Sequence, residues 1–353
     1  MNQEQTTKLE LSVENMKNKK SRIYLIAQDT KGNPKASIAY IYRLGLSLLN
    51  SGYNPIILHE TPEYDGVAEW LGAEYMVLPH KSIEGQNLEV SPDDLLVIPE
   101  LYGFIMEQVS KLPCGKIVLC QAYDHMLETL KPGETWTQFG FYKCITTSQF
   151  QKEFIENVMR GLSFEVIKPY ISDVFTPSKL PAKPIIAVHT RDQRDTVNLI
   201  KSFYIKFPQY RWVTFRDMRG LSESEFASTL RECCLSVWID ETSGFGTFPL
   251  ESMKSGVPVL GLVPNLLPDW MSEDNGLWIN NKIQLVDFVA DYLQNWLEDN
   301  VNDKLLIEMG TTVKSLPTKE EFDTLSVSIF EKFLNTRLAT FEEQLNKLQT
   351  IEE

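Results

Sequence analysis

One glycine-containing segment between two apolar runs has the residue types needed to hold a charged ligand. Leu235–Leu260 predicts a strand over Leu235–Ile239, a loop over Asp240–Phe248, a helix over Pro249–Lys254 and a second strand from Val257. The first turn of such a helix presents backbone N–H groups and the positive end of the helix dipole, which suit a phosphate or a polarised sugar. An ordinary strand–helix crossover that binds no ligand would have the same pattern.

Polar residues follow three predicted strands in the first half of the chain. These strands are Arg22–Ala27, Asp94–Pro99 and Lys116–Cys120. In a doubly wound sheet, polar groups that follow the carboxyl ends of strands face the crevice where ligands bind. We therefore expect one rim to carry Gly32, Asn33, Lys35, Glu100, Gln121, Asp124 and His125.

The elements that must position these residues alternate between strands and helices. Arg22–Ala27 is a compact apolar strand, Ser37–Asn50 has apolar residues at helical spacing, and Pro55–His59 is the next strand. This order over about 30 residues indicates a parallel Rossmann-like unit. The first loop lacks the G-x-G-x-x-G fingerprint, so nothing there favours dinucleotide binding. The rhythm continues with a strand at Tyr75–Leu78 and starts again at Pro184.

The pattern predicts an α/β protein with two Rossmann-like, doubly wound domains that face each other across a cleft. Residues 1–20 are polar and charged, and we expect them to form a mobile tail. We place the first domain at residues 21–170 and the second at 171–318, joined by a proline-containing linker over 169–183. Residues 319–353 predict a final helix. Pockets favour domain interfaces, so the cleft is the expected binding site.

The final helix carries a long apolar stripe. One interpretation is that this stripe covers the protein's own core. The other is a coiled-coil arm through which two copies form an oligomer. The stripe consists of Phe322, Leu325, Ile329, Phe333, Leu334, Leu338, Phe341, Leu345 and Leu348.

Composition narrows the classes of partner. The formal net charge of -14 repels polyphosphate backbones, which argues against nucleic acid. The five cysteines have no C-x-x-C pair and no Cys/His metal spacing, so we expect no metal site and reduced thiols in a cytoplasmic protein. No run approaches the roughly 18 apolar residues of a membrane span. The basic cluster Lys17–Lys20 leaves open a peripheral contact at the inner face of a membrane.

The segment Gly244–Val259, with the sequence GFGTFPLESMKSGVPV, resembles the donor-site signature of GT-B glycosyltransferases. The resemblance is to the retaining family 4 group in particular (glycosyltransferase group 1). Three supporting segments precede it in the expected order: LVIPE at Leu96–Glu100, IVLCQ at Ile117–Gln121 and IKPYIS at Ile167–Ser172. The resemblance covers roughly residues 21–300.

This resemblance implies a binding site for a nucleotide-sugar donor in the second half of the chain. The nucleotide sugar is a substrate, and no cofactor is expected. Glu251 matches a glutamate that binds the ribose hydroxyls. The first glutamate of the family's signature is replaced here by Ser243, and the nearest acid, Glu241, lies two residues earlier. The loop whose backbone amides meet the donor sugar and phosphate corresponds to Gly244, Phe245, Gly246 and Thr247.

Two arginines occupy the place of the Arg and Lys that neutralise the diphosphate leaving group in this family. Arg191 and Arg194 follow the first strand of the second domain, within the sequence R-D-Q-R. Either guanidinium could stabilise the charge that grows on the leaving phosphate. The alternative is a surface ion pair with Asp192 or Asp195.

On the acceptor side, Asp124 and His125 lie where a histidine of this family often faces the donor sugar. The residues expected to bind the acceptor are the other members of that rim, Gly32, Asn33, Lys35, Glu100 and Gln121. An imidazole or carboxylate there could bind a sugar hydroxyl or orient the acceptor. A satisfied polar pair in a loop fits the same residues equally well.

The leading hypothesis is therefore a hexosyltransferase-type glycosyltransferase (EC class 2.4). It would move a sugar from a nucleotide-sugar donor to a hydroxyl of a glycan, glycolipid or glycoprotein, with retention and without a metal ion. One alternative, motivated by Ser243, is a non-catalytic GT-B-like binding or accessory protein. The other is a sugar-nucleotide epimerase on the same fold.

Overall fold

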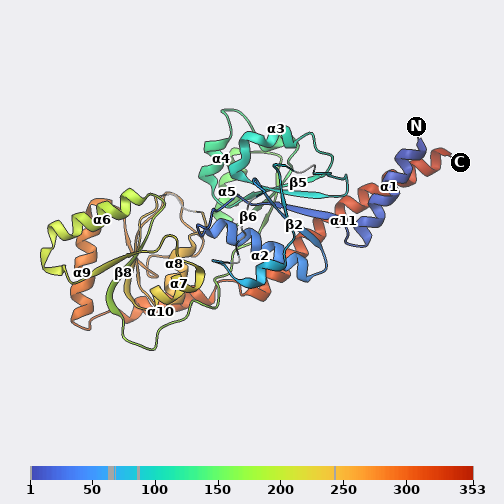
Figure 1. Ribbon diagram of the computed structural model, residues 1–353. Helices are drawn as coiled ribbons and strands as arrows, with labels where there is room; N and C mark the ends of the chain where they lie inside the picture. The colour runs from blue at the N-terminus through green and yellow to red at the C-terminus, as the bar shows by residue number, and fades with distance from the viewer. Residues whose placement is uncertain (1, 63–66, 68, 86–87, 242–243, 353) are drawn as a thin grey trace. The chain divides into compact units, whose positions relative to one another are not determined.

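The computed structural model describes residues 2–62, 67, 69–85, 88–241 and 244–352, and the chain divides into two compact units (Figure 1). Unit 1 comprises Met1–Ala68, Gly72–Ile167 and Glu320–Glu353, and unit 2 comprises Glu69–Leu71 and Lys168–Lys319. The division after Ile167 lies close to the boundary expected at residue 170. The final helix, which we expected to follow the second domain as a separate element, belongs to unit 1.

Unit 1 is built on one parallel sheet. Its strand order is β3-β2-β1-β4-β5-β6-β7, so the chain moves outward in opposite directions from the neighbouring strands β1 and β4. The inner strands are continuous apolar runs because both faces of a parallel sheet are covered. The strands are β1 (Arg22–Ile26), β2 (Asn54–His59), β3 (His80–Ser82), β4 (Leu95–Pro99), β5 (Gly115–Cys120), β6 (Lys143–Thr146) and β7 (Ser163–Val166).

The helix that follows β1, α2 (Ala36–Asn50), packs tightly on β1 and β2. A Cβ atom at Gly45 would lie 3.2 Å from side-chain carbons of both Leu25 and Ile57. Glycine is therefore the residue that allows this close approach of helix and sheet. The other helical segments between β2 and β7 are η1 (Ala73–Val77), η2 (Glu100–Ile105), α3 (Met106–Val109), α4 (Tyr123–Thr129), η3 (Trp136–Phe139) and α5 (Gln149–Val158).

The strand predicted at Tyr75–Leu78 is wrong, because these residues belong to the 3-10 helix η1 and its end. Met76 and Val77 are 71% and 63% exposed, so this apolar run does not mark a buried strand. The strand in this region is the short β3, which pairs with β2 at the edge of the sheet. Its polar sequence, His-Lys-Ser, has no apolar run that could have indicated a strand.

Residues 1–20, expected to form a mobile tail, instead contain the helix α1 (Asn2–Lys17). Val13 and Met16 are buried. Ser12 and Ser21 both donate hydrogen bonds to the carboxylate of Asp93, over 3.2 and 3.1 Å. These contacts hold α1 near the amino ends of β1 and β4, because Ser21 immediately precedes β1 and Asp93 lies two residues before β4.

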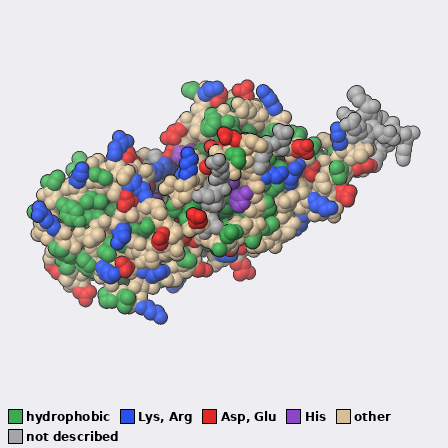
Figure 2. Space-filling view, viewed as in Figure 1, with side chains coloured by type: hydrophobic (Ala, Val, Ile, Leu, Met, Phe, Trp, Pro, Cys, Tyr) green, Lys and Arg blue, Asp and Glu red, His purple; other side chains and the backbone are tan. Residues whose placement is uncertain are grey.

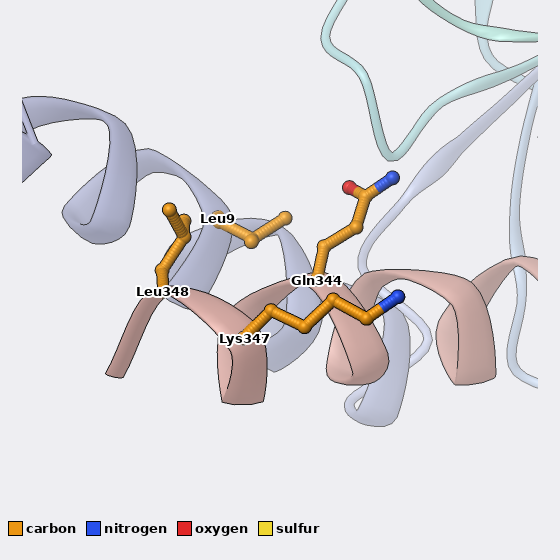
Figure 3. A pocket seen from close by; sticks show the side chains of 4 residues that line it. All are labelled: Leu9, Gln344, Lys347 and Leu348. Carbon is orange, nitrogen blue, oxygen red and sulfur yellow. The ribbon is translucent and has the colours of Figure 1, made fainter. Parts of the chain in front are cut away.

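The last helix, α11 (Lys319–Glu352), returns to unit 1 and lies beside α1 (Figure 1). Phe322, Ile329 and Phe333 are buried, so the first part of the apolar stripe covers the core of unit 1. Further along, Lys17 of α1 pairs with Glu342 at 2.7 Å. A hollow of about 400 Å³ between the two helices is lined by Leu9, Gln344, Lys347 and Leu348 (Figure 3).

Unit 2 is also built on one parallel sheet, with the order β12-β11-β10-β8-β9. Its strands are β8 (Lys183–His189), β9 (Thr214–Asp217), β10 (Cys233–Trp238), β11 (Val259–Leu262) and β12 (Leu277–Ile279). Its helical segments are α6 (Gln193–Lys206), η4 (Pro208–Tyr210), α7 (Glu223–Leu230), α8 (Thr247–Lys254), η5 (Lys282–Gln284), α9 (Leu285–Leu297) and α10 (Asp303–Lys314). Each unit is thus a Rossmann-like, doubly wound α/β structure, as the sequence predicts.

The surface carries charges of both signs. Figure 2 shows Lys and Arg side chains interspersed with Asp and Glu over the face in view. Some form exposed ion pairs, such as Lys183 with Glu232 at 2.7 Å. Pairs of this kind contribute little to stability. Within the described residues, no helix is long and apolar enough to cross a membrane.

Candidate functional site

The central strands of unit 2 meet where the chain changes direction across the sheet. β8 and β10 are neighbours, with β9 beyond one of them and β11 and β12 beyond the other. Ligands of open α/β sheets bind at such switch points, beyond the carboxyl ends of the strands. Arg191 follows β8, and its backbone N–H donates a hydrogen bond to Oδ1 of Asp240, which follows β10, at 2.9 Å. This bond joins the two loops at the expected crevice.

Asp240 is not among the residues that the sequence predicts for this site. Its other carboxylate oxygen, Oδ2, accepts a hydrogen bond from Nε1 of Trp238 at 3.2 Å. Burial raises the pKa of Asp240, and the hydrogen bond from Arg191 opposes that rise. Its position directly after a predicted strand, where polar residues face the crevice, could have identified Asp240 as a site residue.

The helix α8 begins at Thr247, two residues earlier than predicted. Its N-cap residue is Gly246, which adopts a left-handed conformation (φ 76°) and has no side chain that could cap the helix. Pro249 is the third residue of the helix, so its missing N–H falls within the first turn and removes no helical hydrogen bond. The first turn thus directs the N–H groups of Thr247 and Phe248 and the positive dipole end toward the loop.

The loop before α8 is held by a second tryptophan. Nε1 of Trp270 donates a hydrogen bond to the carbonyl oxygen of Phe245 at 2.6 Å. The side chains of Phe245 and Phe248 are buried in the core of unit 2. Buried aromatic anchors on both sides of Gly246 therefore fix where the helix starts.

The acidic residues predicted for the donor site have different settings. Glu241 is exposed three residues after the end of β10, and its carbonyl oxygen accepts a hydrogen bond from the backbone N–H of Asn265 at 2.9 Å. Glu251 is partly buried and lies in the second turn of α8, because the helix starts earlier than expected. Gly244 lies in the loop and is partly buried. Ser243 lies outside the described residues.

The two predicted arginines lie on either side of Asp192, the N-cap residue of α6. Arg194 is paired with Asp192, with its side-chain Nε 2.9 Å from Oδ2, and the same carboxylate accepts the Arg194 backbone N–H as the N-cap of α6. The surface ion pair considered for Arg194 is therefore present. Asp195 pairs instead with Lys282 at 2.6 Å. Arg191 is exposed at the loop that Asp240 holds.

A histidine ends β8 at the same edge of unit 2. The ring of His189 lies 6.0 Å from that of Phe226 and 5.3 Å from that of Phe248, measured between centroids. Burial lowers the pKa of His189. The imidazole is thus kept neutral beside the first turn of α8, where a cation would otherwise meet the positive end of the helix dipole.

Unit 1 has its own switch point, between β1 and β4, and Glu100 lies at the carboxyl end of β4. Its carboxylate is 2% exposed and accepts hydrogen bonds from the backbone N–H groups of Gln121 (3.1 Å) and Ala122 (3.0 Å). Nδ1 of His125 lies 3.4 Å from Glu100 Oε1. The side-chain amide of Gln121 donates a hydrogen bond from Nε2 to the carbonyl oxygen of Ser37 at 3.1 Å. Three of the residues predicted for one rim therefore form one hydrogen-bonded group.

The remaining residues predicted for this rim are Asp124, Lys35, Gly32 and Asn33. Asp124 is partly buried in the first turn of α4, where the sequence predicts a loop. Lys35 precedes α2 and donates to Gln28 Oε1 at 2.8 Å. Gly32 (φ 76°) and Asn33 are exposed in the turn after β1. Among the residues that the structure describes, no three His, Cys, Asp or Glu side chains are grouped to hold a metal ion.

Solved structures that resemble this chain have the GT-B fold. The chain resembles the sucrose-phosphate synthase of Thermosynechococcus elongatus, with a TM-score of 0.64 and 13% identity, over 90% of this chain and 100% of that one. It also resembles Anabaena HepE in complex with UDP and glucose, with a TM-score of 0.60 and 11% identity, over 89% and 99% of the two chains. These similarities establish the GT-B fold, as the sequence predicts.

One curated relative has a detectable sequence similarity. It is an alpha-1,6-glucosyltransferase of Actinobacillus pleuropneumoniae serotype 7 (strain AP76), 20% identical over 245 residues. The match covers 62% of this chain and 72% of the relative. No family model matches the sequence.

Proposed function

We propose that this protein is a glycosyltransferase that moves a hexosyl group, with glucose as the first candidate, from a UDP-sugar to a hydroxyl of a carbohydrate-bearing acceptor. The observation that carries the proposal is the meeting of Arg191, Asp240 and the first turn of α8 at the carboxyl ends of β8 and β10. The glucosyltransferase relative and the UDP and glucose bound by Anabaena HepE support this choice of donor.

In this proposal unit 2 binds the donor and stabilises its leaving group. The diphosphate accepts hydrogen bonds from the N–H groups of Thr247 and Phe248, where the helix contributes roughly half a positive charge. Arg191 supplies a full charge as the bond between the sugar and the phosphate breaks. Glu251 accepts hydrogen bonds from the ribose hydroxyls.

The rim of unit 1 binds the acceptor in this proposal. Gln121 and His125 present polar side chains at the carboxyl ends of the strands, where a sugar hydroxyl could bind. The sugar then passes from the donor phosphate to that hydroxyl oxygen, whose proton must be taken up by a base.

Two finer parts of the proposal concern stereochemistry and metal ions. The resemblance to the family 4 group favours retention of the anomeric configuration. Arg191 and the α8 dipole, rather than a divalent ion, would balance the diphosphate charge. NMR of the first-formed product tests retention, and an unchanged rate after EDTA treatment is expected. An inverted product, or activity that only a divalent ion restores, would contradict the corresponding part.

The donor site is tested by a thermal-shift screen of nucleotide sugars on the wild type and Glu251→Ala. We expect at least one UDP-sugar to raise the melting temperature of the wild type and to do so much less in the variant. Glu232→Ala is the matched control, because Glu232 immediately precedes β10, at the end of the strand away from the proposed site. Equal responses of wild type and Glu251→Ala would remove Glu251 from the donor site.

Turnover is tested separately by mass spectrometry of the products. Transfer adds a hexosyl mass to an acceptor and releases UDP. An epimerase would give a product of unchanged mass, and a non-catalytic binding protein would be stabilised by a UDP-sugar without forming any product. Either result would replace the transferase by one of the alternatives that the sequence left open.

A further inference from the structure

We propose that the outer surface of α6 and α9 in unit 2 is a docking surface for a second copy of this chain, with α6 of one copy lying over α9 of the other. We call this surface the α6/α9 face. It covers one face of the sheet rather than the carboxyl ends of the strands, so the inference does not depend on the proposed function.

The helices of unit 2 form two layers on opposite faces of its sheet. Side chains alternate between the two faces along a strand. Along β8, Ile186 and Val188 pack in the core cluster that contains residues of α6 and α9, whereas Ala187 packs in the cluster that contains residues of α7, α8 and α10. Figure 1 shows the same separation, with α6 and α9 at the left of the unit. The outward sides of α6 and α9 therefore lie next to each other.

The α6/α9 face exposes large apolar side chains, and Ile205 and Phe288 are 81% and 40% exposed. Trp212 belongs to the same surface, since its ring lies 6.0 Å from that of Tyr210, whose hydroxyl donates a hydrogen bond to Gln294 of α9 at 3.3 Å. Figure 2 shows hydrophobic side chains gathered over this part of unit 2. The exposed set is Val197, Ile205, Trp212, Ile283 and Phe288. Apolar side chains that gather in this way mark interaction sites, whereas single exposed ones are common on any surface.

Most charges on α6 and α9 are already paired within the unit. The charges in the first turn of α6 are paired as described above, and Lys206 of α6 pairs with Asp287 of α9 at 2.5 Å. Two charges remain, Lys201 on α6 and Asp291 on α9. Both are exposed, and neither forms an ion pair among the residues that the structure describes. The α6/α9 face thus presents one cation on one helix and one anion on the other.

These two charges lie beside the apolar side chains. Lys201 is four residues from both Val197 and Ile205, and Asp291 is three residues after Phe288. Residues three or four apart lie on the same side of a helix. Each helix therefore presents a charged side chain next to an apolar one on its outward side.

The arrangement of charge selects a second copy as the partner. Oligomers of identical chains most often have two-fold symmetry, in which one surface meets itself. A two-fold axis along the line between the two helices brings Lys201 of each copy to Asp291 of the other. An axis across the helices would instead bring like charges together. A partner with a single sign of charge would be repelled by one of the helices, whereas the α6/α9 face is complementary to itself.

The first test is sedimentation equilibrium over a series of protein concentrations. We expect the wild type to form a reversible dimer and Ile205→Glu to weaken it at least about 30-fold, because a charge would be buried at the centre of the contact. Ile307→Glu is the matched control, since Ile307 is 65% exposed on α10, on the opposite face of the sheet. Both side chains are exposed, so both variants should keep the wild-type melting temperature. A wild type that is monomeric throughout, or equal weakening by both variants, would overturn the proposal.

The second test reverses the two charges. Lys201→Glu and Asp291→Lys should each weaken the dimer about 10-fold, because like charges then meet twice. An equimolar mixture of the two variants should associate as tightly as the wild type, since every contact in the mixed dimer again joins opposite charges. Single variants that associate normally, or a mixture no tighter than either variant alone, would overturn the proposal. A dimer that Ile205→Glu leaves intact and Leu348→Glu abolishes would also overturn it, and would place the contact on α11.

Discussion

The two units place a carboxylate at the same point of the fold. Glu100 follows β4 in unit 1 and Asp240 follows β10 in unit 2, and each strand flanks the switch point of its sheet. Each carboxylate accepts backbone N–H groups from the loop after a neighbouring strand: Gln121 and Ala122 in unit 1, and Arg191 in unit 2. A buried acid in unit 1 and a partly buried acid in unit 2 each fix the loop that carries the candidate functional residues.

The difference lies in what each carboxylate holds beside it. In unit 1 the additional neighbour is the half-exposed imidazole of His125. In unit 2 the carboxylate of Asp240 holds the backbone of Arg191, and the α8 N-terminus lies at the same edge. Unit 1 thus places an imidazole beside its acid, and unit 2 places a helix N-terminus at the same edge as its acid.

The largest expected effect is a difference in how the units respond to acid. In unit 1, burial lowers the pKa of His59 from 6.5 to about 4, with His80 stacked on its ring and Tyr42 and Asp29 in contact. The unfolded chain therefore binds a proton that the folded unit rejects. Unit 1 should lose about 3 kcal/mol of stability as the pH falls from 6.5 to 4.

In unit 2 two groups oppose each other: the lowered pKa of His189 acts with the same sign as that of His59, and the raised pKa of Asp240 acts with the opposite sign. The raised pKa of Asp240 means that the folded unit binds a proton more readily than the unfolded chain, so this contribution to stability is present at low pH and lost as the pH rises. Hydrogen exchange of peptides from both units, corrected for intrinsic rates, would measure how readily each unit opens as the pH falls. We expect unit 1 to open first on acidification and His59→Gln to reduce the effect. An equal loss in both units would contradict the comparison.

The next effect concerns the two arginines of unit 2. Arg191→Ala should weaken UDP binding and transfer about 100-fold, because it removes a charge from the proposed phosphate site. Arg194→Ala should change them less than about fivefold, since that side chain is 86% exposed and already paired with Asp192. Calorimetry with UDP measures both. A larger loss in Arg194→Ala would reverse their assignment.

A smaller effect is expected from the two ends of α8. Gly246 (φ 76°) precedes the helix and Gly256 (φ 74°) follows it, so Gly→Ala at either position should cost about 1 kcal/mol of stability. Only Gly246→Ala should also weaken UDP binding, by several-fold, since it disturbs the first turn. Urea unfolding and calorimetry separate the two effects. Equal loss of UDP affinity in both variants would place the ligand elsewhere.

The sequence predicted the parallel sheets because each buried strand is marked by an apolar run of neighbouring residues. Apolar runs such as Leu95–Pro99 coincide with inner strands, and the segment after β10 begins a helix close to the predicted place. The rim residues Glu100, Gln121 and His125 come together because the carboxyl ends of adjacent parallel strands share one edge.

What the sequence could not predict depends on contacts between distant residues. Helix α1 is polar in composition, and it is ordered by Asp93 and by α11, whose Glu342 is more than 300 residues away from its partner Lys17. The burial of Glu100 likewise follows from the packing of the segment after β4 on α4. No periodic pattern in the sequence predicts this packing. Asp240 was missed for a similar reason, since its partner Arg191 follows a different strand.

The most direct test of the central claim is an NMR titration with UDP that follows backbone amide signals in both units. We predict that the amides of Thr247 and Phe248, at the start of α8, shift on binding, while those of Gln121 and Ala122 keep their positions. Shifts at Gln121 and Ala122 with none at the start of α8 would contradict the claim that unit 2 binds the nucleotide.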